Sequence, residues 1–113
     1  MDNLGFEVMH VYGLTETYGH ILQCAWNEEW ESQSKSEKAD IKARQGVRYP
    51  NTEEVCVADP ETYAKVPMDG ETMGEILIRG NIVMKGYYKN KEATETSMKK
   101  GWFHSGDLAV VYP

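Results

Sequence analysis

The sequence predicts a small α+β fold rich in β-structure, arranged as a distorted antiparallel β-barrel lobe with two short helices. Three observations favour it. Short apolar runs are separated by Gly, Pro and Asp residues, which are typical of turns between strands. Two segments carry the polar residues that begin helices. The length of 113 residues allows one domain at most.

The first part of the chain predicts a strand followed by a functional turn. Residues 6–12 alternate apolar with less apolar side chains, and Gly13 is expected to end the strand. Thr15 and Glu16 then fall in the turn after it, which is the usual place for a ligand site in an α/β sheet. Residues 20–30 are apolar and aromatic before they become acidic, and we expect a loop with some helix there.

The clearest helix signal begins at Ser34. Ser34 and Glu37 have the spacing of a capping box, in which each side chain bonds the backbone N–H of the other residue. Good helix formers follow, and a helix is expected over 37–45. Gly46 suits the position just after a helix end.

Short strands are expected in the remainder of the chain. They are predicted at residues 54–58, 74–79 and 108–112, with extended chain at 81–88. In the clearest of them, Ile76 and Ile78 share one face. Asn90 is expected to cap a short helix that continues through Met98, and Gly101 is expected to end it.

Composition narrows the class of protein. The net charge is −6 and there is no run of Lys or Arg, which argues against nucleic-acid binding. No apolar stretch approaches the ~20 residues that a membrane span needs, and no signal peptide pattern is present. Cys24 and Cys56 are far apart in the sequence, which favours two free thiols in a reducing cytoplasm over a disulfide.

Two short stretches carry the functional signal, at residues 12–17 and 101–108. The first holds an aromatic ring, a glycine, a hydroxyl and a carboxylate within five residues: Tyr12, Gly13, Thr15 and Glu16. A nucleotide bound with magnesium needs a flat face for its base, a donor for a phosphate oxygen and an oxygen ligand for the metal. The second stretch contains Asp107, whose carboxylate can accept two hydrogen bonds from the vicinal hydroxyls of a ribose.

Together with residues 74–90, these stretches resemble, in this order, the motifs of the adenylate-forming superfamily. That superfamily includes acyl-CoA synthetases, peptide-synthetase adenylation domains and firefly-type luciferases. The resemblance implies that residues 1–113 are a partial AMP-binding domain from the end of the large N-terminal domain of a longer protein. Residues 1–20 would be the end of its central sheet with the adenylate motif, and residues 46–113 its β-rich lobe with the ribose-binding turn.

The resemblance implies a role for each motif residue. The Tyr12 ring would lie on adenine and Gly13 would let the base come close. Thr15 would donate to the α-phosphate, Glu16 would bind Mg²⁺, and Asp107 would bind the ribose. Simpler interpretations stand beside these: a core aromatic, a hydroxyl bonded to its own backbone, a carboxylate at a helix N-terminus and a plain turn former.

Four neighbours of these residues are further candidates. Many superfamily members have Asn or Gln at the position of His10, and that amide side chain contacts the adenine edge. His10 departs from this pattern. Leu14, Thr17 and Tyr18 are candidates for the wall of the acyl pocket because they accompany the adenylate motif.

The resemblance favours an acyl-CoA ligase. Residues 102–107 resemble the ligase form of the signature more than the peptide-synthetase form, and packing is the expected role of Trp102 and His104. Such an enzyme joins a short- or medium-chain carboxylic acid to ATP as an acyl adenylate and then transfers the acyl group to coenzyme A, using Mg²⁺. The alternatives are a peptide-synthetase adenylation domain and a non-catalytic β-rich binding module.

We expect the isolated chain to be inactive as a ligase. The phosphate-binding loop of the superfamily would lie before residue 1, and the hinge and the catalytic Lys would lie after residue 113. Coenzyme A, ATP and the acid are therefore the expected partners of a longer enzyme, of which this chain supplies one part.

Overall fold

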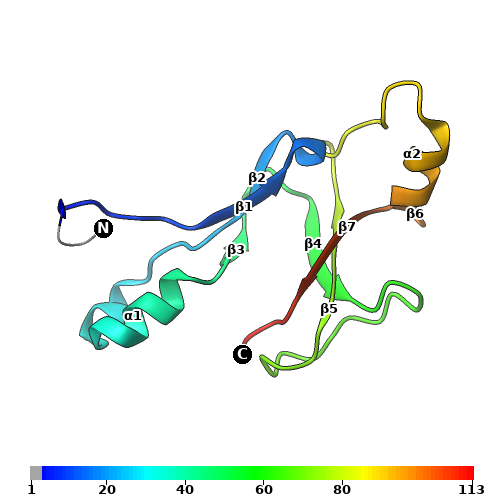
Figure 1. Ribbon diagram of the computed structural model, residues 1–113. Coiled ribbons are helices and arrows are strands. Elements are labelled where there is room, and N and C mark those ends of the chain that lie inside the picture. The colour runs from blue at the N-terminus through cyan, green and yellow to red at the C-terminus, as the bar shows by residue number, and fades with distance from the viewer. Residues whose placement is uncertain (1–3) are drawn as a thin grey trace. The chain divides into compact units, whose positions relative to one another are not determined.

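A computed structural model describes residues 4–113 and divides the chain into two compact units (Figure 1). The first unit ends at Asn51 and the second begins at Thr52. Each unit has its own antiparallel sheet, with three strands in the first and four in the second. The expected β-rich lobe began at residue 46, whereas the second unit begins later because β3 (Val47–Arg48) pairs with β2 (Gly19–Gln23) of the first sheet.

The first sheet has the order β1-β2-β3, with β1 spanning Val11–Leu14. The strand expected at 6–12 is thus wrong in its extent, because pairing with β2 begins only at Val11. Gly13 does not end the strand: it lies inside β1, next to a bulge between Tyr12 and Gly13. The loop expected at 20–30 is also partly wrong, because β2 occupies its beginning and a 3₁₀ helix (Glu28–Ser32) its end.

Helix α1 spans Lys35–Lys42 and confirms the predicted capping box. The Ser34 hydroxyl accepts a hydrogen bond from the Glu37 N–H at 3.3 Å, and the Glu37 carboxylate accepts one from the Ser34 N–H at 2.8 Å. The helix ends before the expected residue 45. Gly46 has a left-handed φ of +84°, and a Cβ there would overlap the backbone of Gln23, so glycine is needed for the close approach to β2.

The second sheet is open, which corrects the expected barrel. Its order is β4-β5-β7-β6, with strands β4 (Glu54–Ala58), β5 (Gly74–Arg79), β7 (Trp102–Ala109) and β6 (Met98–Lys99). Closure would require β4 and β6 to bond each other, and within residues 4–113 they are the two free edges. The α+β, β-rich class is confirmed, and β4 and β5 have the bounds that the sequence predicted.

Strand β5 forms the centre of the second sheet and carries most of its core. Ile76 and Ile78 are buried on one face, as expected, and Leu77 is buried on the other. Phe103 of β7 pairs with Ile78 and is also buried. Both faces of β5 are therefore covered, which explains its near-continuous apolar sequence.

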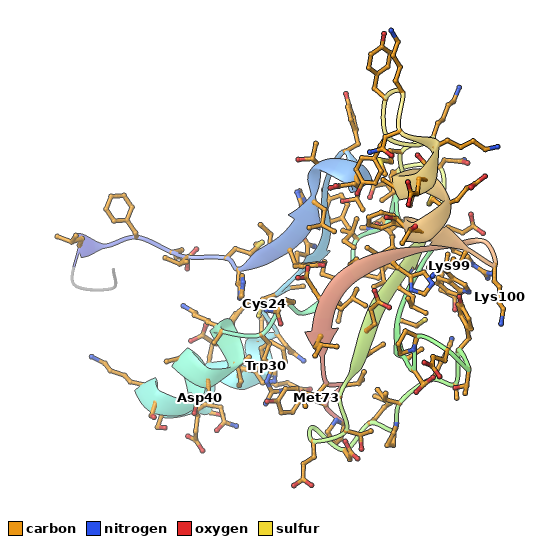
Figure 2. The ribbon with its side chains drawn as sticks, turned by 45° about the vertical axis from the view of Figure 1, so that its right-hand side comes forward. Cys24, Trp30, Asp40, Met73, Lys99 and Lys100 are labelled. Carbon is orange, nitrogen blue, oxygen red and sulfur yellow. The ribbon has the colours of Figure 1, made fainter. Side chains whose placement is uncertain are left out.

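The last third of the chain differs from the prediction in two places. Residues 81–88 form turns and not extended strand, and the last strand is β7 instead of 108–112. Helix α2 spans Lys91–Ser97 and begins as predicted, because the Asn90 side chain accepts from the Ala93 N–H at 3.0 Å. Lys99 and Lys100 lie where β6 turns into β7 (Figure 2). No helix in residues 4–113 combines the length and the apolar character that crossing a membrane requires.

Candidate functional site

The Thr-Glu pair lies in the tight turn that joins β1 to β2, as predicted. Residues Thr15–Thr17 form one turn of 3₁₀ helix directly after Leu14. Thr15 is exposed and Glu16 is half-buried. Tyr18 ends the turn with a left-handed φ of +57°, and its side chain is 93% exposed. The turn thus carries a hydroxyl residue and a carboxylate residue in succession, followed by an exposed aromatic ring.

The Thr17 hydroxyl holds this turn together. It accepts a hydrogen bond from the Leu14 N–H at 3.0 Å and lies 2.9 Å from both the Leu14 and the Gly19 carbonyl oxygens, one of which takes its proton. Thr17 is only 2% exposed. Its hydroxyl is therefore used inside the turn, whereas Leu14 is half-buried and Tyr18 is open to solvent.

Gly13 is required by the backbone of the neighbouring strand. A Cβ at this position would overlap the carbonyl oxygen of Gly19 and lie 2.5 Å from the Cα of His20. Real Cβ atoms do not approach backbone this closely. This close contact lies between the bulge next to Tyr12 and the turn after Leu14, where β1 pairs with β2. The prediction that Gly13 also lets a base approach remains a prediction.

His10 is tied to the C-terminal end of α1. Its Nδ1 lies 2.8 Å from the carbonyl oxygen of Ala43, and because a carbonyl only accepts, Nδ1 carries the proton. The His10 carbonyl accepts from the Cys24 N–H at 2.9 Å, and the Cys24 thiol donates to the Ile41 carbonyl at 3.3 Å beside α1 (Figure 2). These bonds anchor the chain just before β1.

The Gly-Asp pair lies within β7, in a bulge at residues 105–107, and not in a separate turn. The pairs on either side of it are Leu77 with His104 and Glu75 with Leu108. Three residues of β7 therefore lie opposite one residue of β5. A bulge of this kind leaves backbone groups outside the ladder and makes the strand bend.

The bulge presents Asp107 to solvent. Gly106 adopts a left-handed φ of +78°, with nothing within 4 Å of a Cβ built there. Asp107 is exposed, and its N–H donates to the Ser105 hydroxyl at 3.1 Å. Asp107 belongs to the second unit, whereas His10, the residues of β1 and the Thr-Glu turn belong to the first and are brought together there.

Glu75 was not predicted as part of a site. Its carboxylate accepts from the Gly106 N–H at 2.9 Å and from His104 Nδ1 at 2.8 Å. His104 Nε2 lies 3.0 Å from the Tyr63 hydroxyl. The available signal was a carboxylate inside an otherwise apolar strand, since such a group is buried only when it has partners.

Trp102 packs against an ion-pair network on the same face of the sheet. The Arg79 guanidinium lies 4.7 Å from the Trp102 ring centre and 2.6 Å from the Glu54 carboxylate. Lys65 completes the network at 2.9 Å from Glu54. The hydrogen bond from Lys65, with the charges of both cations, holds the pKa of Glu54 below its ordinary value.

Glu16 is the residue expected to bind Mg²⁺. Within residues 4–113 there is no group of three or more His, Cys, Asp or Glu side chains that could hold a metal ion. Mg²⁺ usually keeps several waters and takes one or two carboxylates together with substrate phosphates. A single half-buried carboxylate next to the Thr15 hydroxyl fits that pattern.

Comparison with known protein families gives a direct result. The model of the AMP-binding enzyme family matches residues 1–88. The chain belongs to the AMP-binding enzyme family. This confirms the resemblance carried by the motifs.

The relatives within this family include plant CoA ligases. The chain is 56% identical over all 113 residues to an acetate–CoA ligase of Humulus lupulus and 53% identical to a peroxisomal acetate/butyrate–CoA ligase of Arabidopsis thaliana. It is 46% identical to a peroxisomal benzoate–CoA ligase of Arabidopsis thaliana. The chain spans about 20% of the length of each of these proteins.

Solved structures of CoA synthetases share the fold. An o-succinylbenzoate CoA synthetase from Bacillus subtilis, solved with ATP and magnesium, matches 98% of this chain with a TM-score of 0.69 and 25% identity. The unliganded form of that enzyme matches 98% with a TM-score of 0.72. The chain covers 20% and 21% of those two chains.

Proposed function

We propose that the full-length enzyme carrying this chain is an ATP-dependent ligase that joins a short- or medium-chain carboxylic acid to coenzyme A. One observation supports this most directly: the 56% and 53% identities, over the whole chain, are to ligases named for acetate and butyrate.

The reaction has two halves. The carboxylate of the acid attacks the α-phosphorus of ATP, and pyrophosphate leaves with the electron pair of the broken P–O bond. The thiolate of coenzyme A then attacks the acyl carbon, and AMP leaves. The first half depends mainly on positioning and on neutralising charge.

The residues of the first unit have distinct roles in this proposal. The Thr15 hydroxyl, exposed on the 3₁₀ turn, donates to an α-phosphate oxygen. The Tyr12 ring packs on the adenine. His10 can offer Nε2 as an acceptor to the adenine edge, because Nδ1 already donates to Ala43.

The acyl pocket wall is assigned to the residues around the same turn. Leu14 offers a half-buried aliphatic side chain, and Tyr18 offers an exposed ring. Thr17 contributes to the wall by holding the turn, since its hydroxyl is bonded to Leu14 and Gly19.

Glu16 would hold Mg²⁺ together with phosphate oxygens and water. When bound, the ion neutralises negative charge on the phosphates. Glu16 is a half-buried residue in the middle of the 3₁₀ turn, and the Thr17 hydroxyl bonds Leu14 and Gly19 on either side of that turn, so the backbone that carries the carboxylate needs little reorganisation. ATP and coenzyme A would be the co-substrates of the full-length enzyme.

We also propose that both units belong to the end of the large N-terminal domain of the enzyme. The motif order supports this placement, and 98% of the chain matches a CoA synthetase structure about five times its length. The barrel expected from the sequence remains a proposal for the full-length protein, because the four strands described here form an open sheet.

The cellular compartment is part of the proposal. Cys24 and Cys56 are free thiols, which suits a reducing compartment. Two of the three plant relatives described above are named peroxisomal, which extends the expected compartment from the cytoplasm to the peroxisome. Fluorescent tagging of the full-length protein in its own cells distinguishes the two.

The identity of the acyl acceptor distinguishes a CoA ligase from a peptide-synthetase adenylation domain. We expect the full-length enzyme to release AMP with acetate or butyrate only to the extent that it forms a CoA thioester. Transfer to a carrier-protein pantetheine with no product on free coenzyme A would favour a peptide-synthetase domain. The absence of any adenylation by the folded full-length protein would favour the non-catalytic module.

The isolated 113-residue chain is expected to show no ligase activity. The chain spans about 20% of the length of its ligase relatives, so it supplies only a part of the residues that the reaction needs. Pyrophosphate release and acyl-CoA formation should be assayed with a series of linear acids. Turnover close to that of a full-length relative would contradict this expectation.

Asp107→Ala in the full-length enzyme is expected to weaken ATP binding about ten- to hundred-fold, the usual value of charge-assisted hydrogen bonds. The rate of the bound complex should change little, because the ribose hydroxyls do not change during the reaction. Calorimetric titration with ATP and a melting curve on the same sample measure both effects. A lower melting temperature with unchanged ATP affinity would show that Asp107 only shapes the bulge.

A further inference from the structure

A buried carboxylate with no part in the proposed chemistry lies beside the bulge of β7. The side chain of Glu75 is only 11% exposed. One of its oxygens accepts from the Gly106 N–H at 2.9 Å, and the other lies 2.8 Å from His104 Nδ1. A buried charge is costly unless it is hydrogen-bonded, so this carboxylate is held by these contacts and holds them in turn.

His104 is fixed on both of its ring nitrogens. A carboxylate only accepts, so Nδ1 donates to Glu75, and in the neutral ring Nε2 accepts from the Tyr63 hydroxyl at 3.0 Å. The rings of Tyr63 and His104 also meet edge to face at 5.6 Å. The hydrogen bonds from Tyr63 to His104 and from His104 to Glu75 therefore set the direction of the Glu75 carboxylate.

This series of hydrogen bonds ends at Gly106, the residue next to Asp107. Gly106 lies in the bulge, where two extra residues of β7 interrupt the ladder to β5. The bond from the Gly106 N–H to Glu75 ties the bulge to β5, while the bond from Asp107 to Ser105 stays within the bulge itself. The position of the Asp107 backbone thus depends on Glu75.

We propose that Glu75, oriented by His104 and Tyr63, is a positioning residue that holds the Gly106–Asp107 bulge in the geometry that binds the ribose of the nucleotide. This inference rests on the ribose role proposed for Asp107. Glu75 lies in β5, whereas Asp107 lies 32 positions later in the sequence, in β7.

The test compares two substitutions of Glu75 in the full-length enzyme. Glu75→Asp keeps the charge but withdraws the carboxylate by one methylene, so that it cannot reach Gly106 and His104 together. Glu75→Gln keeps the length: its carbonyl accepts from Gly106, and its NH₂ donates to His104 Nδ1 once the ring takes its other tautomer. The dissociation constants of ATP and 2′-deoxy-ATP, the KM values of ATP and acid, and kcat are measured for both.

We expect wild type to prefer ATP over 2′-deoxy-ATP by about tenfold or more. In Glu75→Asp the ratio of the dissociation constants of 2′-deoxy-ATP and ATP should fall below about twofold, a binding free-energy difference of less than about a third of RT ln 10. The KM of ATP should rise while kcat and the KM of the acid change little. Glu75→Gln should keep the preference. Loss in the Gln variant with retention in the Asp variant would overturn the inference.

Glu54→Asp is the matched control. It makes the same change on the same sheet, where Glu54 pairs with Arg79 and Lys65. We expect its ATP preference to equal that of wild type even if its melting temperature falls. If Glu54→Asp loses as much preference as Glu75→Asp, the effect is a general loosening of the sheet and the inference is wrong.

Asp107→Ala separates the inference from the function on which it rests. If Asp107→Ala keeps the full preference for ATP, the ribose role itself fails. If it loses the preference while Glu75→Asp retains it, the ribose role stands and the positioning role is overturned. In the double variant we expect no loss beyond that of Asp107→Ala, and an additive loss would show that Glu75 acts independently of Asp107.

Tyr63→Phe covers the case in which Glu75→Asp does not fold. It removes only the hydroxyl partner of His104 and leaves the Glu75 carboxylate in place. We expect the preference for ATP to fall by at least about twofold, a small fraction of one charge-assisted bond. An unchanged preference in a folded Tyr63→Phe enzyme would overturn the inference.

Discussion

Gly13→Ala is expected to destabilise the first unit by about 3 kcal/mol, near the upper range for overpacking of a well-packed site. The added methyl group would overlap the Gly19 carbonyl oxygen and lie 2.5 Å from the Cα of His20, and both obstacles are backbone. Backbone cannot move aside as a flexible side chain can, so β1 and β2 must separate. The full-length enzyme should then lose ATP binding together with stability.

Gly101→Ala is the control for this prediction. Gly101 has a left-handed φ of +80° but open space around a Cβ, so its cost should be about 1–2 kcal/mol from backbone strain alone. Chemical denaturation and ATP titration of both variants measure the difference. If Gly13→Ala has wild-type stability and only weaker ATP binding, the glycine serves the approach of the base and not the crossing of the strands.

Glu16→Gln in the full-length enzyme is expected to raise the activation free energy of adenylation by about 2–4 kcal/mol. This is the size of effect seen when other preorganised electrostatic groups are removed from an active site. The carboxylate supplies negative charge for the metal that accompanies the phosphates, and a neutral amide does not. Thioester formation from supplied acyl adenylate should be less affected, because no pyrophosphate leaves in that step. Single-turnover assays of each half-reaction measure the two effects.

Glu28→Gln removes the same charge from an exposed 3₁₀ helix of the same unit and should leave both half-reactions unchanged. Metal titration sharpens the test. Glu16→Gln should need more Mg²⁺ for half-maximal adenylation than wild type, whereas Glu28→Gln should not. Equal losses in both half-reactions with an unchanged Mg²⁺ requirement would contradict a metal role for Glu16.

Local signals in the sequence were sufficient where the determining contacts are local. The capping box of Ser34 and Glu37 joins residues three apart, and the cap of Asn90 acts within one turn, so both helices are capped by the residues predicted. Strands β4 and β5 are bounded by turn residues and were predicted with their correct ends. The Thr-Glu turn after β1 was also foreseen, since its position follows from one strand and one motif.

The sequence was misleading where pairing between distant strands decides the structure. Gly106 and Asp107 are typical turn formers, and only their register against β5 shows that they form a bulge within β7. The sequence predicts a strand end at Gly13, but the close approach of the β2 backbone requires a glycine inside the strand. The predicted barrel required two edge strands to meet, and no local signal specifies whether they do.

The link between Glu75 and Gly106 also has a consequence for chimeric enzymes. Residues 81–99 lie between the two partners in the chain and include α2 and β6, yet the hydrogen bond bypasses them. A recombination boundary between β5 and β7 would combine a Glu75 from one parent with a bulge from another. Crossovers placed before Gly74 or after Ala109 inherit both partners from the same parent, and such exchanges should preserve nucleotide binding more often than crossovers inside that interval.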